Sequence, residues 1–109
     1  MTSFFGSEQI PAYAASKGAV AQLTKALSNE WAGRGVNVNA IAPGYMVTQL
    51  TADMQGKNPA QYAEITGRIP MHRWGQPEDL QGAVVFLASP AAAYVTGAIL
   101  PVDGGYLGR

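Results

Sequence analysis

Two short runs rich in β-branched residues constrain the fold of this chain more than any other feature. The first covers residues 36–42 and the second covers residues 97–102, and a glycine-containing turn follows each run. Their length and their flanking Gly and Pro residues are typical of strands. Helical patterns fill the sequence between them, so the two strands are expected to run parallel in one sheet and to be joined by a crossover. The sequence therefore predicts an open α/β fold.

Helices are expected on both sides of the first strand. The spacing predicts one long helix over residues 12–33, in which four apolar residues recur as a buried stripe does: Val20, Leu23, Leu27 and Trp31. Gly33 and Gly35 are the stop signal of that helix. The expected order is helix, strand, helical lid, helix and strand, with the further helices listed here: about residues 48–55, about residues 60–67, and from Gln76-Pro77 to about Ser89.

The second strand should lie at or near the edge of its sheet. Pro101 has no N–H group and cannot donate to a strand ladder. Two strands and two main helices are also fewer than a parallel sheet normally needs to be covered on both faces. Residues 1–109 are therefore expected to form one partial domain.

Composition narrows the possible functions. The chain has 109 residues, of which 48% are hydrophobic, and its seven basic residues balance its seven acidic ones. A zero net charge gives no electrostatic footprint for nucleic acid or an anionic membrane, and no apolar run approaches the length of a membrane span. Cysteine is absent and His72 is the one histidine, so no metal site is expected. The expected location is the cytoplasm.

Tyr13 and Lys17 stand four residues apart at the start of the first predicted helix. This spacing puts the phenol and the ammonium on one helix face, one turn apart. The cation of Lys17 and the positive end of the helix dipole both favour the ionised form of Tyr13. Such a tyrosine can act as a general acid or base. The alternative is an ordinary surface pair that stabilises the helix by a few tenths of a kcal/mol.

A Pro43-Gly44 turn ends the first predicted strand. The carboxyl ends of strands are where an α/β sheet forms its ligand crevice. Gly44 would let the backbone approach a ligand closely, and Thr48 offers a hydroxyl shortly afterwards. A plain turn is the alternative.

Residues 45–75 are less regular. Four of them are adaptable apolar residues that could form a lid over a small substrate or could simply fill gaps under a surface helix: Met46, Leu50, Met54 and Met71. His72, Arg73 and Trp74 could face an anionic substrate. Alternatively, Arg73 forms a structural ion pair and Trp74 packs.

Together these segments resemble the C-terminal half of the short-chain dehydrogenase/reductase family. Tyr13-Ala14-Ala15-Ser16-Lys17 is similar to the family's Tyr-x-x-x-Lys motif, and residues 36–44 are similar to its following strand and Pro-Gly turn. Residues 73–79 and 97–105 are similar to its later signatures. The resemblance covers essentially the whole chain, and it implies the C-terminal half of a Rossmann-like doubly wound parallel sheet.

The resemblance also implies a role for each matching residue. Tyr13 would exchange a proton with the carbinol or carbonyl oxygen of the substrate, and Lys17 would hold the nicotinamide ribose. The cofactor would be NAD or NADP, with NAD slightly favoured, and five further residues would line its site: Pro43, Gly44, Tyr45, Val47 and Thr48, the last bonding the carboxamide or the phosphates. On the substrate side the candidates are Met46, Arg73 and Trp74.

Within the family, two segments look most similar to sugar-acid dehydrogenases that act on 2-deoxy-gluconate or 2-keto-3-deoxy-gluconate. These segments are residues 69–75 and 103–106. Related 3-oxoacyl reductases carry similar segments and remain the alternative. The family resemblance further implies a homo-oligomer, a dimer or a tetramer, formed through residues 12–33, residues 79–88 and the final strand.

Other motifs of the family have no counterpart in this sequence. Its glycine-rich turn and the residue that chooses between NAD and NADP belong to an N-terminal half, and its catalytic serine would lie just ahead of Met1. Thr2 and Ser3 stand in the wrong register for that serine. The remaining alternative is therefore a truncated, non-catalytic fragment that only self-associates.

Overall fold

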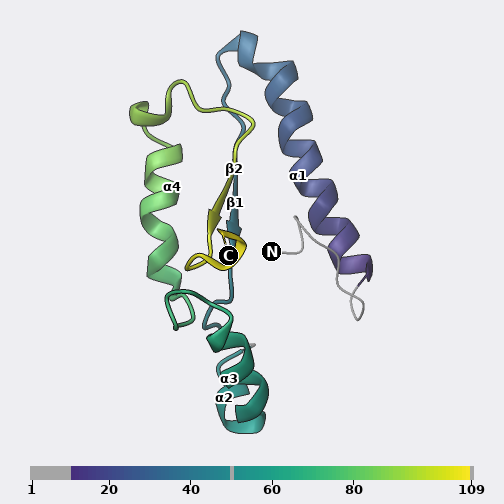
Figure 1. Ribbon diagram of the computed structural model, residues 1–109. Coiled ribbons are helices and arrows are strands. Elements are labelled where there is room, and N and C mark those ends of the chain that lie inside the picture. The colour runs from purple at the N-terminus through teal and green to yellow at the C-terminus, as the bar shows by residue number, and fades with distance from the viewer. Residues whose placement is uncertain (1–10, 50, 109) are drawn as a thin grey trace.

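The computed structural model describes residues 11–49 and 51–108, and Figure 1 shows their arrangement. The helices and strands follow in the order α1 (Pro11–Trp31), β1 (Ala40–Pro43), α2 (Met54–Lys57), α3 (Pro59–Gly67), α4 (Gln81–Leu87) and β2 (Ile99–Val102). Four short 3₁₀ helices lie between or after them: Ala32–Arg34, Pro77–Leu80, Pro90–Ala92 and Tyr106–Gly108. The predicted loop at residues 1–10 and the lid residue Leu50 lie outside the described residues.

The two strands pair in parallel, as the sequence predicts. The register runs from Ala40 opposite Ile99 to Pro43 opposite Val102. Figure 1 shows α1 and α4 on opposite sides of this two-stranded sheet, with α2 and α3 beyond the end at which both strands finish. The described part of the chain is therefore an α/β arrangement in which a crossover through α2, α3 and α4 joins two parallel strands.

Both strands are shorter than predicted. Ahead of them, side-chain hydrogen bonds join the two segments alongside a backbone bond from the Gly97 N–H to the Val38 carbonyl. The Asn39 amide nitrogen donates to the Val95 carbonyl at 2.8 Å, and its amide oxygen accepts from the Ala98 N–H at 3.0 Å. Asn37 likewise donates to the Ala93 carbonyl at 3.1 Å. These bonds keep residues 36–39 beside the chain that precedes β2 without making them part of the sheet.

The prediction of a helix at about residues 48–55 is wrong. The chain turns through residues 51–53, and α2 begins only at Met54 and runs through Gly56 and Lys57, where an interruption was expected. The Thr51 hydroxyl bonds to nearby backbone groups, which gives the chain an alternative to helical bonding. The break falls at Asn58, whose side chain accepts from the Gln61 N–H at 3.2 Å and caps α3.

The other predicted helices are largely confirmed. α3 lies within one residue of the expected range, and the last helix starts at Pro77 as a 3₁₀ turn before continuing as α4. The long first helix ends at Trp31 and is followed by a 3₁₀ turn. Gly35 then adopts a φ of 80° and donates its N–H to the Ala32 carbonyl at 3.0 Å, as a glycine stop signal should.

The prediction that the apolar stripe of α1 is buried is wrong for the described residues. Val20 and Leu23 are 52% and 55% exposed, whereas the buried residues of this helix are Thr24 and Ser28. The Ser28 hydroxyl bonds to the Thr96 hydroxyl at 2.8 Å, next to β2. The helix thus turns a polar side toward the sheet. Two of the four stripe residues are exposed among the described residues, and the other two, Leu27 and Trp31, are half-buried.

The main apolar core lies beyond the sheet, around Trp74. Its buried members are Ile65, Ile69, Trp74 and Tyr106, and it is completed by half-buried Tyr45, Val47, Met54 and Tyr62. The core therefore joins α3, the segment after β1 and the C-terminal turn. Across residues 11–49 and 51–108, no helix is both long and apolar enough to span a membrane.

Candidate functional site

Tyr13 and Lys17 share one face of α1, as their spacing predicts. The Lys17 ammonium nitrogen lies 5.3 Å from the centre of the Tyr13 ring. Both side chains line a cleft of about 250 Å³ between α1 and the sheet, together with residues 40–44 and Ile99. Tyr13 is 51% exposed, so its hydroxyl is open to a molecule in the cleft. The structure thus brings together the predicted acid–base pair and the predicted Pro43-Gly44 turn.

Gly44 has a packing role of its own. Its N–H donates to the Val102 carbonyl at 2.9 Å, which extends the pairing of the two strands. A Cβ atom on this residue would lie only 2.6 Å from the Cα of Asp103. Glycine is therefore required here because the turn after β2 packs directly against the turn after β1.

Residues 44–48 contain the residues predicted to bind the cofactor and are here called the cofactor loop for that prediction; they continue from β1 and are tied to Gly75. The Gly75 N–H donates to the Tyr45 carbonyl at 2.9 Å, and the Val47 N–H donates to the Gly75 carbonyl at 2.8 Å. This pair of bonds forms an isolated parallel bridge between Met46 and Gly75. The position of the loop is thus set by a segment almost thirty residues further along the chain.

Tyr45 packs into the core through its ring. The ring centroid lies 5.4 Å from that of Trp74 and 5.6 Å from that of Tyr106. Burial raises the pKa of the Tyr45 phenol above its usual value, and the neighbouring Tyr106 adds to the rise. Burial in the core therefore disfavours the ionised form of the Tyr45 phenol.

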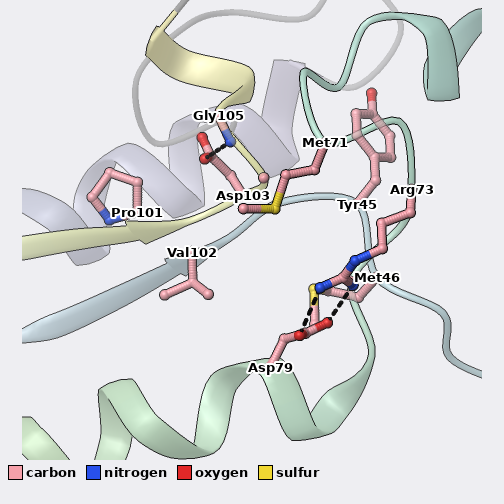
Figure 2. A pocket seen from close by; sticks show the side chains of 11 residues that line it. Tyr45, Met46, Met71, Arg73, Asp79, Pro101, Val102, Asp103 and Gly105 are labelled. Atoms are coloured by element: carbon pink, nitrogen blue, oxygen red, sulfur yellow. Dashed lines mark hydrogen bonds and ion pairs between the residues drawn. The ribbon is translucent and has the colours of Figure 1, made fainter.

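Arg73 forms a two-pronged ion pair with Asp79. Its two terminal nitrogens lie 2.7 and 2.9 Å from the carboxylate oxygens, as the dashed lines in Figure 2 show. The Arg73 guanidinium holds the pKa of Asp79 down at about 2, and the Gln76 N–H at 2.7 Å acts in the same direction. This geometry supports the structural alternative for Arg73 over a role in holding an anionic substrate.

Trp74 also fits the structural alternative. It is only 3% exposed, its ring stacks on that of Tyr62 at 5.0 Å, and its indole N–H donates to the Thr66 hydroxyl at 3.0 Å. A side chain with its ring packed and its N–H satisfied inside the core has little surface left for a ligand.

A second cavity of about 370 Å³ lies at the far side of the cofactor loop, shown in Figure 2. Met46, Met71 and Arg73 line it, together with residues 101–105. The Asp103 carboxylate at its rim accepts from the Gly105 and Leu107 N–H groups, both at 2.9 Å, and so closes the turn after β2. In the part of the chain that the structure describes, no group of three or more His, Cys, Asp or Glu side chains could hold a metal ion.

Two residues that touch the cofactor loop were missed at the sequence level. Gly75 holds the loop through its backbone, and Thr51 bonds to it through its side chain. A signal for Thr51 was present, because a hydroxyl residue three positions after Thr48 is suited to bond back to the backbone of that turn. Backbone bonding by Gly75 leaves no such local signal.

Comparison with known proteins finds relatives that match almost the whole chain. The family model described as Enoyl-(Acyl carrier protein) reductase matches residues 1–107. The chain is 59% identical over 109 residues to a 2-dehydro-3-deoxy-D-gluconate 5-dehydrogenase of Pseudoalteromonas atlantica, covering all of this chain and 42% of the relative. The chain thus spans about two fifths of the length of such curated relatives.

Solved structures of similar proteins also match the chain closely. The crystal structure of a candidate 2-deoxy-d-gluconate 3-dehydrogenase from Agrobacterium tumefaciens, with bound NADP, superposes with a TM-score of 0.94 at 55% identity. The match covers 99% of this chain and 44% of that structure. A candidate NAD(P)-dependent gluconate 5-dehydrogenase from Beutenbergia cavernae, with NADP at low occupancy, gives a TM-score of 0.93 at 58% identity, covering all of this chain and 43% of that structure.

Proposed function

Because the chain belongs to the short-chain dehydrogenase/reductase family, we propose that it is the catalytic part of an NAD(P)-dependent dehydrogenase. The reaction is hydride transfer between a nicotinamide cofactor and an alcohol or ketone group of a sugar acid. The observation that carries this proposal is that Tyr13 and Lys17 open into one cleft with the end of β1. The names of the relatives support a sugar-acid substrate over a 3-oxoacyl substrate.

The proposal includes the larger fold. Residues 1–109 are proposed as part of one domain and as the C-terminal half of a Rossmann-like doubly wound sheet. The chain covers less than half of each compared relative, and β1 and β2 make a sheet of only two strands in the described residues. The protein of its relatives' length that carries this chain is called the parent protein below.

The residues around the first cleft fit a nicotinamide cofactor. Its walls include the small residues Ala21, Ala40, Ala42 and Gly44, which leave room for a flat ring. Among the described side chains, no carboxylate lies within ion-pair distance of Lys17, so its ammonium can donate to ribose hydroxyls. Lys17 would hold the ribose, with the remaining contacts made by Tyr13, Pro43, Gly44, Tyr45, Val47 and Thr48.

Either NAD or NADP is compatible with these contacts. The family resemblance slightly favours NAD, whereas both compared structures hold NADP. When bound, the nicotinamide supplies or accepts the hydride.

Tyr13 performs the proton transfer. Its hydroxyl donates a proton to the carbonyl oxygen during reduction and removes the proton from the alcohol during oxidation. The Lys17 ammonium, 5.3 Å from the ring centre, stabilises the negative charge that forms on the phenol oxygen. Of the three substrate-side candidates, Met46 lies in the cofactor loop and, like Arg73, lines the second cavity.

Replacing Tyr13 by Phe in the parent protein tests this proposal. The variant loses the acid–base hydroxyl alone, so turnover should fall by about 10²- to 10⁴-fold. The Kd for NAD(H) and NADP(H), measured by calorimetric titration, should stay nearly unchanged. Lys17→Ala should impair both turnover and cofactor binding.

Tyr94→Phe is the matched control, because Tyr94 is fully exposed and does not line the cleft. It should leave turnover and binding as in the wild type. Turnover retained by the Tyr13→Phe variant would refute the assigned mechanism.

Self-association is a second proposal, which holds whether or not the chain is catalytic. Val84, Val85 and Phe86 on α4 are 52%, 67% and 42% exposed, and Val20 and Leu23 on α1 are similarly exposed. Exposed apolar faces of this kind favour contact between copies, as a dimer or a tetramer. Light scattering should report an oligomer that Val85→Asp weakens. A monomer at micromolar concentration would exclude it.

A further inference from the structure

One pair of hydroxyl groups fastens the C-terminal part of α1 to the strands. The Ser28 and Thr96 hydroxyl oxygens lie 2.8 Å apart, although the two residues are 68 positions apart in the sequence. Ser28 is only 4% exposed. Within residues 11–49 and 51–108, no other hydrogen bond joins a side chain of α1 to the strands or to the segments ahead of them. The buried hydroxyl of Thr24 donates instead to the Val20 carbonyl inside the helix.

Backbone groups ahead of both strands meet at this contact. The Val38 N–H donates to the Thr96 hydroxyl oxygen at 3.1 Å, and the Gly97 N–H donates to the Val38 carbonyl at 2.8 Å. A hydroxyl has one proton and two lone pairs, so Thr96 can accept from Val38 and still bond to Ser28. A Cβ atom on Gly97 would lie 3.1 Å from the Ser28 hydroxyl oxygen, so the helix approaches the backbone closely. These four residues, Ser28, Val38, Thr96 and Gly97, are here called the hydroxyl junction.

The hydroxyl junction and the α1 cleft lie toward opposite ends of the helix. Figure 1 shows that α1 runs antiparallel to β1, so its C-terminal end lies toward the start of the strands. Tyr13 and Lys17 lie toward the other end, where the cleft separates them from Pro43 and Gly44. Ser28 follows Tyr13 by some four helical turns, which is about 22 Å along the axis. The helix therefore touches the chain at the junction and stands apart from it at Tyr13.

The contacts between the junction and Tyr13 are made by small side chains. The half-buried residues of α1 ahead of Thr24 are Ala14, Gly18 and Ala21. Side chains of this size make few van der Waals contacts and so hold the inclination of a helix weakly. A rotation of about 5° around the junction would move Tyr13 by about 2 Å. A misplacement of about 1 Å can slow a reaction about 100-fold.

We propose that Ser28 and Thr96 are positioning residues, whose hydroxyl contact fixes the inclination of α1 and thereby the width of the cleft at Tyr13. The inference rests on the proposed function, because it takes Tyr13 as the group that transfers the proton. It goes further by assigning the placement of Tyr13 relative to the sheet to a contact at the far end of the helix.

The first test compares Thr96→Val with Thr96→Ser in the parent protein. Valine keeps the branched shape and removes the hydroxyl, whereas serine keeps the hydroxyl. At saturating substrate and cofactor, kcat should fall about 10- to 100-fold in the valine variant, because Tyr13 leaves the position that proton transfer needs. The serine variant should keep the wild-type kcat. A wild-type kcat in Thr96→Val, or a serine variant as impaired as the valine one, overturns the inference.

The second test removes the same contact from the helix side. Ser28→Ala should lower kcat as Thr96→Val does, and the double variant should be no slower than the slower single variant, because both changes break one contact. Losses that multiply in the double variant overturn the inference.

Thr24→Val is the matched control for both tests. Thr24 is buried on α1 as Ser28 is, but its hydroxyl bond ends within the helix. Its loss should leave kcat as in the wild type. A fall in kcat as large as that of Thr96→Val would show that any buried hydroxyl of α1 has this effect, and it would overturn the specific role of the junction.

Crystal structures of the parent protein without cofactor separate this inference from the proposed function. The distance between the Cα atoms of Tyr13 and Gly44 should differ by about 1–2 Å between the wild type and Thr96→Val, and should be unchanged in Thr96→Ser. An unchanged distance in Thr96→Val overturns the inference even if the parent protein is an active dehydrogenase. A wild-type parent protein that binds no nicotinamide cofactor instead overturns the proposed function, and the catalytic part of this inference with it.

Discussion

The α1 cleft and the Trp74 core hold the two halves of the proposed site in different ways. In the α1 cleft, Tyr13 and Lys17 stand on a helix whose apolar side chains Val20 and Leu23 are more than half exposed. In the Trp74 core, Ile69 and Trp74 are almost completely buried, and the half-buried Tyr45 and Val47 of the cofactor loop pack against that core.

The difference shows which part of the proposed site is held in place by contacts within the described residues. The cofactor loop is held by Gly75, Thr51 and Val102 through hydrogen bonds that lie wholly within the described residues. The spacing of Tyr13 and Lys17 comes from the helix alone, whereas the seating of that helix on the sheet relies on few buried residues, Thr24 and Ser28. Within the described residues, the position of the predicted acid–base pair is therefore held by fewer buried contacts than that of the cofactor loop.

Trp74→Ala should give the largest effect on stability in this chain. The substitution empties the centre of the core and removes the bond to Thr66, so the free energy of unfolding should fall by about 3–5 kcal/mol. Urea unfolding measures this loss. Trp31→Ala on α1 is the matched control, and it should cost much less because Trp31 is only half-buried. Equal losses for the two tryptophans would show that α1 packs as firmly as the Trp74 core.

Gly44→Ala should give an intermediate effect at the point where the two regions meet. The new Cβ would lie 2.6 Å from the backbone of Asp103, so the turns after β1 and β2 must move apart at a cost of about 1–3 kcal/mol. Gly82→Ala in α4 is the control, since a Cβ there meets no atom within 4 Å. Alanine in that helix should stabilise the protein by up to about 1 kcal/mol. Melting temperatures that shift in the same direction would contradict this contrast.

Asp79→Asn should give the smallest effect, and it should depend on pH. The pKa of Asp79 is about 2 in the folded chain, against an ordinary value of 3.8, because Arg73 and the Gln76 N–H favour its charged form. Since the folded pKa is the lower one, the pair stabilises the protein above about pH 4, and this stabilisation disappears as the pH falls through about 2. The pair is exposed to solvent, so the effect is modest.

The measurement is the urea midpoint followed from about pH 5 down to about pH 2. The Asp79→Asn variant should show a smaller loss of stability over this window than the wild type. Asp53→Asn is the control, because Asp53 forms an exposed pair with Lys57 within one short helix. Identical pH profiles for the wild type and Asp79→Asn would mean that the Arg73–Asp79 pair does not stabilise the fold.

Much of the local structure follows from the sequence because it depends on near neighbours. Three features rest on groups within a few residues of each other: the stop at Gly35 after the 3₁₀ turn that follows α1, the start of α3 at Asn58-Pro59, and the start of the 3₁₀ turn at Pro77. The parallel pairing of β1 and β2 also follows, since the helical sequence between them leaves room for a crossover. The spacing of Tyr13 and Lys17 likewise depends only on residues close together in the sequence.

Other features could not be predicted from the sequence pattern, because they depend on partners far along the chain. Ahead of β1, Asn37 and Asn39 bond to the chain before β2, more than fifty residues away. The helix predicted to carry the apolar stripe does form, yet no pattern could tell that the described residues leave Val20 and Leu23 uncovered.

The sequence by itself determined which chemical groups this protein brings to its proposed site: a tyrosine and a lysine one helical turn apart, and a Pro-Gly turn at the end of a strand. Spacing along a helix or strand suffices for this, because local geometry is periodic. Only the tertiary structure decided that Gly75 and Thr51 hold the cofactor loop, and that Arg73 and Trp74 are engaged within the fold. Those outcomes depend on which distant groups meet, and on which donors and acceptors are already satisfied when they do.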